Sequence, residues 1–417
     1  MGIFKRRSAF KNARVPLNKE LIVSTKKLGL LPRLIIAIVA GILIGNLTRS
    51  IHLPLPVQIL ATFNGVFGNF LSFIIPLIIL GFVIPGIADL GSDAGKLLAI
   101  TAGIAYGSTL LAGTLAFATD SVFFPFFLSS HADVFSHTNP EDALLPGLFG
   151  IDMPPLMGVM TALILSFVLG IGIAVTRSET LKNAAREFQN IVTKVIEVII
   201  IPLLPIHILG VFTNMTHAGQ VGLILKVFIK VFAIVIALHV IIILIQYIIA
   251  CMVAKRNPFT SIKTMLPAYV TALGTQSSAA TIPVTLASAK KIGIQERIAD
   301  FVIPLCATIH LAGSTITLTS CAMAILILHG QTASASVMLP FIAILGVAMV
   351  AAPGIPGGAV MAALGFVQSI LGFNDTMSSL IIALYIAQDS FGTACNVTGD
   401  GAIAILVDAI SKDKKKE

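Results

Sequence analysis

The sequence predicts an all-α membrane protein with eight transmembrane helices and two re-entrant helical hairpins, arranged as inverted repeats. Of its 417 residues, 56% are hydrophobic and only 11% are charged, whereas soluble domains carry about 25% charged residues. The apolar residues form long runs, such as 231–254 and 337–352. Two further apolar segments contain helix breakers in their middle, which favours hairpins whose irregular backbone is shielded by the rest of the protein.

Eight apolar segments qualify as spanning helices, because about 20 apolar residues cross the hydrocarbon core. They cover residues 33–53, 59–89, 94–119, 156–176, 187–216, 220–254, 297–329 and 376–410. The segments 258–292 and 335–373 are interrupted, the first after Gly274 and the second by a Pro- and Gly-rich run at 353–358. We expect a hairpin in each; the alternative is four short helices joined by ordinary loops. Paired interruptions in one half indicate an inverted repeat with a binding site between the tips.

The formal net charge of +8 comes from basic clusters that flank the apolar segments, including nine Lys or Arg within residues 5–33. Such flanks mark the cytoplasmic side and suit anionic lipid, and they do not indicate nucleic acid. No Lys or Arg occurs within residues 97–176, so we expect an external loop from Asp120 to Asp152. By the same rule, the first hairpin enters from the cytoplasm and the second from outside. We expect a multi-pass plasma-membrane protein whose ends, residues 1–32 and 411–417, are cytoplasmic.

Four polar side chains share one face of the last predicted helix. Asp389, Thr393, Asn396 and Asp400 are spaced i, i+4, i+7 and i+11, which places them in a narrow stripe. Carboxylates inside a membrane are costly and usually face a cavity or pathway, yet residues 298–411 contain no Lys or Arg to pair with them. A metal ion, a proton or a ligand ammonium must then neutralise them. The alternative is that both acids are protonated and structural.

The tip of the first hairpin and a break in the seventh helix are also polar. At the tip, Gln276, Ser277 and Ser278 precede the returning half-helix, whose N-terminal amides can hold a carboxylate. A carboxylate site facing an Asp suits a zwitterionic amino acid, although small tip residues can serve packing alone. Gly313 permits unwinding after His310, and carbonyls freed at such a break suit Na⁺. His310 could instead relay protons or hydrogen-bond between helices.

These residues resemble the dicarboxylate/amino acid:cation symporters, the family of the glutamate transporter homologues. The resemblance covers most of the chain, and it is most specific at residues 277–284, 304–315, 354–358 and 389–400. It implies a homotrimer that moves a small molecule by an elevator-type alternating-access mechanism.

The resemblance also implies a division of the chain into two domains. Residues 33–89 and 156–216 would form the trimerisation scaffold. Residues 94–119 and 220–410, with both hairpins, would form the transport domain, and the second hairpin would be the extracellular gate.

The implied substrate site lies between the hairpin tips and the last helix. Asp389 and Thr393 would hold the amino group of the substrate, and Asn396 would hold its α-carboxylate together with the first tip. The implied substrate contacts are Gln276, Ser277, Ser278, Gly357, Asp389, Gly392, Thr393 and Asn396. The implied Na⁺ ligands, mostly through carbonyls, are Cys306, Thr308, His310, Asn396 and Asp400.

Two positions depart from the members that carry acidic substrates, where an Arg pairs with the side-chain carboxylate. These positions are Gly392 and Gln276, and a buried carboxylate without a partner costs several kcal/mol. We therefore expect a small neutral amino acid, as in the serine/threonine branch, and Gly392 leaves volume for a larger side chain. Ala312 and Tyr385 replace two family acids, so we expect Na⁺ at one or two sites. The alternative is an acidic amino acid or C4-dicarboxylate symporter, with H⁺ as a possible coupling ion.

Other classes of protein fit less well. Asp389 and Asp400 lie about 16 Å apart along one helix, so they cannot form the dyad of an aspartyl protease, whose carboxylates lie about 3 Å apart. Hairpins also build channels, but a carrier saturates and counter-exchanges its solute, whereas a pore does neither. The sequence contains no nucleotide-binding loop of the G-x-x-x-x-G-K-[ST] type. We therefore expect a carrier and not an enzyme, with no cofactor besides the coupling ion.

Overall fold

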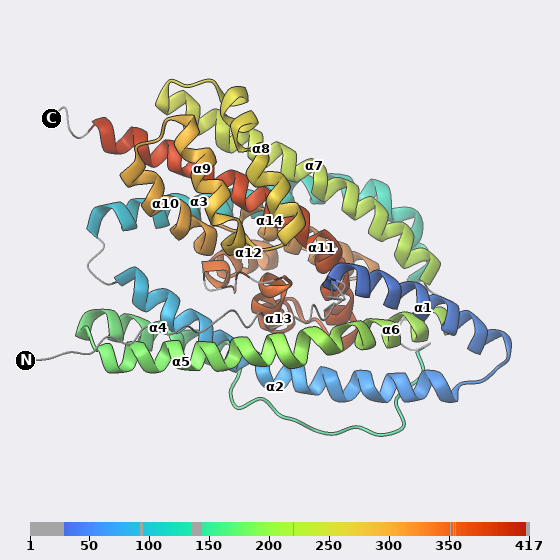
Figure 1. Ribbon diagram of the computed structural model, residues 1–417. Coiled ribbons are helices and arrows are strands. Elements are labelled where there is room, and N and C mark those ends of the chain that lie inside the picture. The colour runs from blue at the N-terminus through green and yellow to red at the C-terminus, as the bar shows by residue number, and fades with distance from the viewer. Residues whose placement is uncertain are drawn as a thin grey trace, which may run out of the picture.

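The computed structural model describes residues 29–91, 95–135, 144–219, 221–350, 352, 354 and 356–413, and within these ranges every regular element is a helix (Figure 1). The helices are α1 (Leu30–Ser50), α2 (Leu55–Gly91), α3 (Gly95–Phe135), α4 (Val159–Thr176), α5 (Glu179–Val195), the π-helical turn η2 (Ile196–Ile200), α6 (Ile201–His217), α7 (Val221–Ala254), α8 (Pro258–Thr275), α9 (Ser278–Ile292), α10 (Glu296–Ile309), α11 (Ala312–Leu328), α12 (Ala335–Val350), α13 (Gly358–Leu371) and α14 (Asp375–Asp413). Of the predicted cytoplasmic ends, residues 1–28 and 414–417 lie outside the described residues.

The predicted fold class is confirmed. The described residues contain eight helical stretches that are long and apolar enough to cross a membrane, when α5 to α6 and α10 to α11 are each counted as one stretch. The two interrupted segments form the helical pairs α8–α9 and α12–α13, which are the predicted hairpins. The break expected in the seventh helix separates α10 from α11 at His310 and Leu311.

The helices form two groups. In Figure 1, α2, α4, α5 and α6 lie in one layer, while α3, α7 to α11 and α14 lie together above it, with α13 between them. Helix α1 packs along α6, and α2 packs along α4 and α6. The contact between α1 and α6 needs a glycine, because a Cβ added at Gly41 would lie 2.7 Å from the Leu209 carbonyl oxygen. In the other group, α14 packs against α7, α8 and α11, so the polar last helix is enclosed by its neighbours.

Local capping explains where the first hairpin turns. Asn257 begins α8 by accepting hydrogen bonds from the amides of Phe259 and Thr260, as an N-cap residue does. The helix ends where Gln276 adopts a left-handed conformation with φ 54°. Ser277 then begins α9 by accepting a hydrogen bond from the amide of Ala280. The tip therefore consists of the left-handed residue Gln276, which reverses the chain, and Ser277, which caps the next helix.

The third helix differs from its prediction. The sequence predicts a helix that ends at residue 119 and an external polar loop that starts at Asp120, but α3 continues to Phe135. Asp120 lies inside this helix and is fully buried. The apolar run Val122 to Phe126 follows it, and such a run continues the helix in spite of one internal Pro. The prediction of a loop at Asp120 is therefore wrong, because the apolar residues after Asp120 continue the helix and bury the carboxylate inside the protein.

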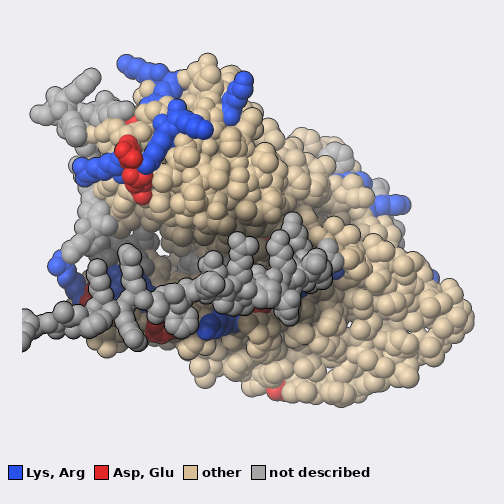
Figure 2. All heavy atoms as spheres, in the orientation of Figure 1, with Lys and Arg blue, Asp and Glu red and all other residues tan. Residues whose placement is uncertain are grey.

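Charged side chains gather at one end of the molecule. In the face that Figure 2 shows, Lys and Arg cluster mainly at the end where α8, α9 and α10 lie, and much of the remaining surface carries no charged residue. At this end, Lys290 forms ion pairs with Glu296 at 2.7 Å and with Asp300 at 2.9 Å. Hydrogen bonds to Glu296 and Asp300 raise the pKa of the exposed Lys290 ammonium. A broad uncharged surface with a basic end is typical of a membrane-embedded chain.

Candidate functional site

The polar stripe on α14 lies inside the protein. The side chains of Asp389, Thr393, Asn396 and Asp400 all belong to buried residues, with 1–5% of their surface exposed. The N-terminal part of the stripe faces the tip of the second hairpin, and its later part faces the break between α10 and α11. Both carboxylates are therefore enclosed by protein.

Asp389 lies against the tip of the second hairpin. The backbone amide of Gly357 donates a hydrogen bond of 2.7 Å to the Asp389 carboxylate. Gly357 precedes α13 and has φ +76°, a conformation that favours glycine. Tyr385, one turn earlier on α14, donates to the Ser314 hydroxyl at 3.0 Å and lies beside Asp389. The second hairpin thus covers a carboxylate that no Lys or Arg of the neighbouring sequence neutralises.

The two hairpin tips contact one another. The hydroxyl of Ser277 donates a hydrogen bond of 2.8 Å to the carbonyl oxygen of Gly354. The same hydroxyl caps α9, because its oxygen accepts from the Ala280 amide at 3.2 Å. Gln276 and Ser277 are half-buried, and Ser278 is buried. The N-terminus of α9 and the tip that covers Asp389 are therefore adjacent.

Asn396 stabilises the break between α10 and α11. Its side-chain oxygen accepts hydrogen bonds from the amides of Gly313 at 2.8 Å and Ser314 at 3.3 Å. Its side-chain nitrogen donates to the Ser314 hydroxyl at 3.0 Å. The first amides of a helix have no partner within the helix, and Asn396 supplies one for α11. The amide that the resemblance assigns to a substrate carboxylate is thus engaged with the protein in this conformation.

Asp400 lies against His310 at the same break. One carboxylate oxygen lies 2.9 Å from His310 Nδ1, and the other is buried without a hydrogen-bond partner among the described residues. His310 Nε2 lies 3.1 Å from the Ser108 hydroxyl and 3.3 Å from Gln246 Nε2. Because an amide nitrogen only donates, the network is satisfied when Nε2 accepts and Nδ1–H donates to Asp400. One Asp400 oxygen is thus left as a buried acceptor beside the break between α10 and α11.

The other implied ion ligands lie near this break. The carbonyl oxygen of Cys306 accepts from the His310 amide at 2.9 Å, as the last turn of α10 requires. Thr308 is exposed, and its hydroxyl donates to the Leu305 carbonyl at 2.7 Å. Among the described residues, no three His, Cys, Asp or Glu side chains come together as a metal site. The oxygens at the break suit a hard monovalent cation better than a transition metal.

The surroundings of Gly392 differ from the expected open volume. A Cβ at this position would lie 3.6 Å from the Ser314 amide and 3.6 Å from the Thr317 hydroxyl. These are van der Waals contacts with α11, so the space beside Gly392 belongs to helix packing. Gly313 faces the same contact, where its own Cβ would lie 2.6 Å from the Gly392 carbonyl oxygen.

Three further polar residues belong to this region, although the sequence analysis did not select them. Ser108 and Gln246 complete the His310 network, with the Gln246 amide donating to Ser108 at 2.8 Å. His239 Nε2 lies 3.0 Å from the Gly313 carbonyl and 3.1 Å from the Thr317 hydroxyl. The sequence does indicate two of them, because His239 and Gln246 are isolated polar residues in the apolar run 231–254.

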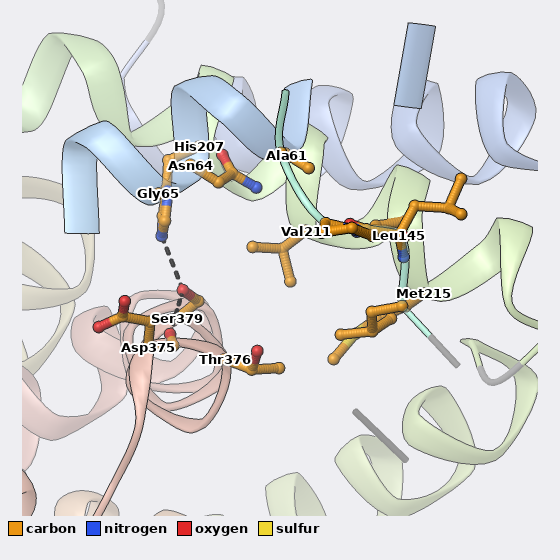
Figure 3. A pocket seen from close by; sticks show the side chains of 14 residues that line it. Ala61, Asn64, Gly65, Leu145, His207, Val211, Met215, Asp375, Thr376 and Ser379 are labelled. Atoms are coloured by element: carbon orange, nitrogen blue, oxygen red, sulfur yellow. Dashed lines mark hydrogen bonds between the residues drawn. The ribbon is translucent and has the colours of Figure 1, made fainter. Parts of the chain in front are cut away.

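A cavity of about 330 Å³ lies elsewhere, between α2, α6, residues 144–147 and the start of α14 (Figure 3). His207 of α6 points across it toward α14, where its Nε2 lies 2.7 Å from the Ser379 hydroxyl. No residue of the predicted substrate or ion site lines this cavity. Asp375, which does line it, is about 21 Å from Asp389 along the helix axis. The cavity is therefore separate from the polar stripe.

Comparison with known proteins agrees with this architecture. The sequence matches the sodium:dicarboxylate symporter family over residues 30–410. It is 25% identical over 405 residues to the serine/threonine transporter SstT of one Acinetobacter baumannii strain, which covers 93% of this chain and 98% of the relative. It is 30% identical over 169 residues to SstT of Acinetobacter baylyi, covering 39% of this chain and 42% of the relative. Because the family match includes nearly every described helix, the chain belongs to the sodium:dicarboxylate symporter family.

Proposed function

We propose that the protein is a secondary active symporter that carries a small neutral amino acid, coupled to Na⁺, by elevator-type alternating access. The observation that carries this proposal is the position of Asp389, which is buried beneath the second hairpin tip without a basic residue nearby in sequence. A carboxylate in such a place costs free energy unless a positive partner arrives. The ammonium group of an amino acid is such a partner.

The substrate would lie between Asp389 and the first hairpin tip. Its ammonium would contact Asp389 and Thr393, and its carboxylate would face the N-terminal amides of α9 beside Ser277 and Ser278. Neither Gln276 nor Gly392 supplies the positive charge that an acidic side chain needs. A neutral substrate follows, and the names of the serine/threonine relatives support this choice.

The coupling cation would bind at Asp400. Its unpartnered oxygen supports a Na⁺ ligand at the break between α10 and α11. A proton-coupled symporter is the second candidate, because His310 already contacts the other Asp400 oxygen and an imidazole can serve as a positive partner in place of a metal ion.

The domain division, the trimer and the membrane orientation are parts of the same proposal. The helices α1, α2, α4, α5 and α6 pack mainly against one another, which supports their role as a scaffold. Exposed apolar residues along α1 and α4 suit lipid or another copy of the chain. We propose that the protein is homotrimeric in the plasma membrane, with both ends on the cytoplasmic side.

The test is uptake of radiolabelled L-serine, L-threonine and L-alanine into proteoliposomes, with an inward Na⁺ gradient or with choline, at two pH values. We expect saturable, Na⁺-dependent uptake and counter-exchange, with no competition from excess L-aspartate or succinate. Strong competition by L-aspartate would contradict the neutral substrate. Uptake that follows the pH gradient and ignores Na⁺ would replace Na⁺ by H⁺.

A further inference from the structure

Asp120 is a buried acid in α3 that faces the Ser320 hydroxyl of α11. Its side chain has no exposed surface, and neither carboxylate oxygen meets a donor in full hydrogen-bond geometry among the described residues. A charged group in such surroundings is strongly destabilising unless it is paired or binds a cation. The sequence around it contains no Lys or Arg within residues 97–176. Asp120 takes no part in the proposed substrate site or in the Asp400 site.

Other buried oxygens without partners lie on α11 and α14. Ser320 of α11 lies beside Asp120, and the hydroxyl oxygens of Ser320 and Thr319 have no partner among the described residues. The side-chain nitrogen of Gln388 on α14 donates to the Leu384 carbonyl at 3.0 Å, while its side-chain oxygen is also buried and unpartnered. Buried oxygens without partners thus occur on all three helices, α3, α11 and α14, among the described residues.

Cys321 shows that these groups converge. It lies near Asp120, and its sulfur accepts from the Gln388 side-chain nitrogen at 3.5 Å. The carboxylate of α3 and the amide of α14 thus both lie near Cys321 of α11. Each unpartnered buried polar group costs about 1–3 kcal/mol, so a cluster of them indicates a missing ligand.

The register of α3 and α11 separates this cluster from the Asp400 site. Ser108 contacts His310, Gly113 faces Thr315, and Asp120 faces Ser320. The two helices therefore run in parallel, and Asp120 lies about 18 Å along α3 from the residue that contacts His310. Among the described residues, carboxylate oxygens without a partner thus lie at both ends of this shared interface, two on Asp120 and one on Asp400.

We propose that Asp120, Ser320 and Gln388 form a second cation site, which binds Na⁺. All three supply oxygen ligands, which hard cations prefer. One carboxylate balances one monovalent charge, whereas Ca²⁺ sites combine more oxygen ligands with several carboxylates. The site is distinct from the transported amino acid, so it exists whether or not the proposed substrate is correct.

The test measures Na⁺ binding directly on the full-length protein in detergent. Thermal unfolding is followed against NaCl, with choline chloride at matched ionic strength, and bound ²²Na⁺ is counted per chain. The variants are Asp120→Asn, Asp400→Asn and their combination. We expect Asp120→Asn to lose one bound Na⁺ per chain and part of the Na⁺-dependent rise in Tm. The double variant should lose the rest. Asp408→Asn, at an acid that already has protein partners, is the matched control and should keep both.

The proposal is overturned if Asp120→Asn binds as much ²²Na⁺ as the wild type, because a structural protonated acid would behave in this way. It is also overturned if K⁺ raises the Tm as Na⁺ does. Should Asp120→Asn fail to fold, Ser320→Ala and Gln388→Met remove one ligand each, and both should raise the Na⁺ concentration at half-saturation at least tenfold. None of these readouts depends on amino acid uptake.

Discussion

A disulfide between the two hairpin tips should arrest transport. The double substitution is Ala279→Cys with Gly354→Cys, and a Cβ at Gly354 would lie 3.6 Å from the Ala279 Cβ. Bonded cysteines have Cβ atoms about 3.5–4.5 Å apart, so the bond can form without backbone movement. Both positions are exposed, and the four native cysteines are buried. Selective oxidation of the new pair is therefore expected.

The magnitude follows from the position of the pair. The bond closes a loop of roughly 75 residues, which should stabilise the folded state by about 4–5 kcal/mol through the entropy of the unfolded chain. Uptake should fall to the level of empty liposomes, because a substrate cannot reach Asp389 while the tips are joined. Reduction should restore both the original Tm and uptake.

The assay combines copper-phenanthroline oxidation, a maleimide mass-shift gel that gives the cross-linked fraction, and amino acid uptake. The matched controls are the single variants Ala279→Cys and Gly354→Cys, which carry the same exposed thiols but cannot form the bond between the tips. Both should keep their uptake after oxidation. Full cross-linking of the hairpin pair with unchanged uptake would refute the idea that the tips must separate.

Three further substitutions test individual contacts. Asp389→Asn should weaken amino acid binding by about 30-fold to a few thousand-fold, because truncating one partner of a buried charge pair costs about 2–5 kcal/mol. Competition binding measures the affinity, and a change under threefold would contradict the ammonium contact. Gly313→Ala places a Cβ 2.6 Å from the Cys395 Cβ and should destabilise the protein by about 1–3 kcal/mol, visible as a lower Tm; an unchanged Tm would show that α11 can shift freely. Asp408→Ala removes the acceptor for the Gln295 amide and side chain, at 3.2 and 3.0 Å, and should cost about 2–3 kcal/mol, whereas Asp408→Asn should recover most of the Tm.

Much of the fold followed from hydropathy, because long apolar runs and internal breakers are properties of the sequence itself. The hairpins and the break after His310 were predicted from Gly, Pro and polar interruptions. The start of the fifth predicted helix at residue 187 was less accurate, because the structure begins α5 at Glu179. There Ser178 caps a helix whose polar face gives no apolar run.

The site was harder to predict because its members come from distant parts of the chain. The stripe on α14 was visible as a helical spacing, but the partner of each residue was not. Asn396 is engaged by the α11 amides, and Ser108 joins His310 from about 200 positions away. The burial of Asp120 could not be predicted from the sequence, because it arises only when α3 packs against other helices.

The claim that Asp389 receives the ammonium group of the substrate is tested most directly on the substrate itself. Uptake of radiolabelled L-serine into proteoliposomes is measured with excess unlabelled L-serine, N-acetyl-L-serine or glyceric acid, in which the amine is free, blocked or replaced by a hydroxyl. The account predicts that only L-serine competes. Equal competition by N-acetyl-L-serine or by glyceric acid would contradict it.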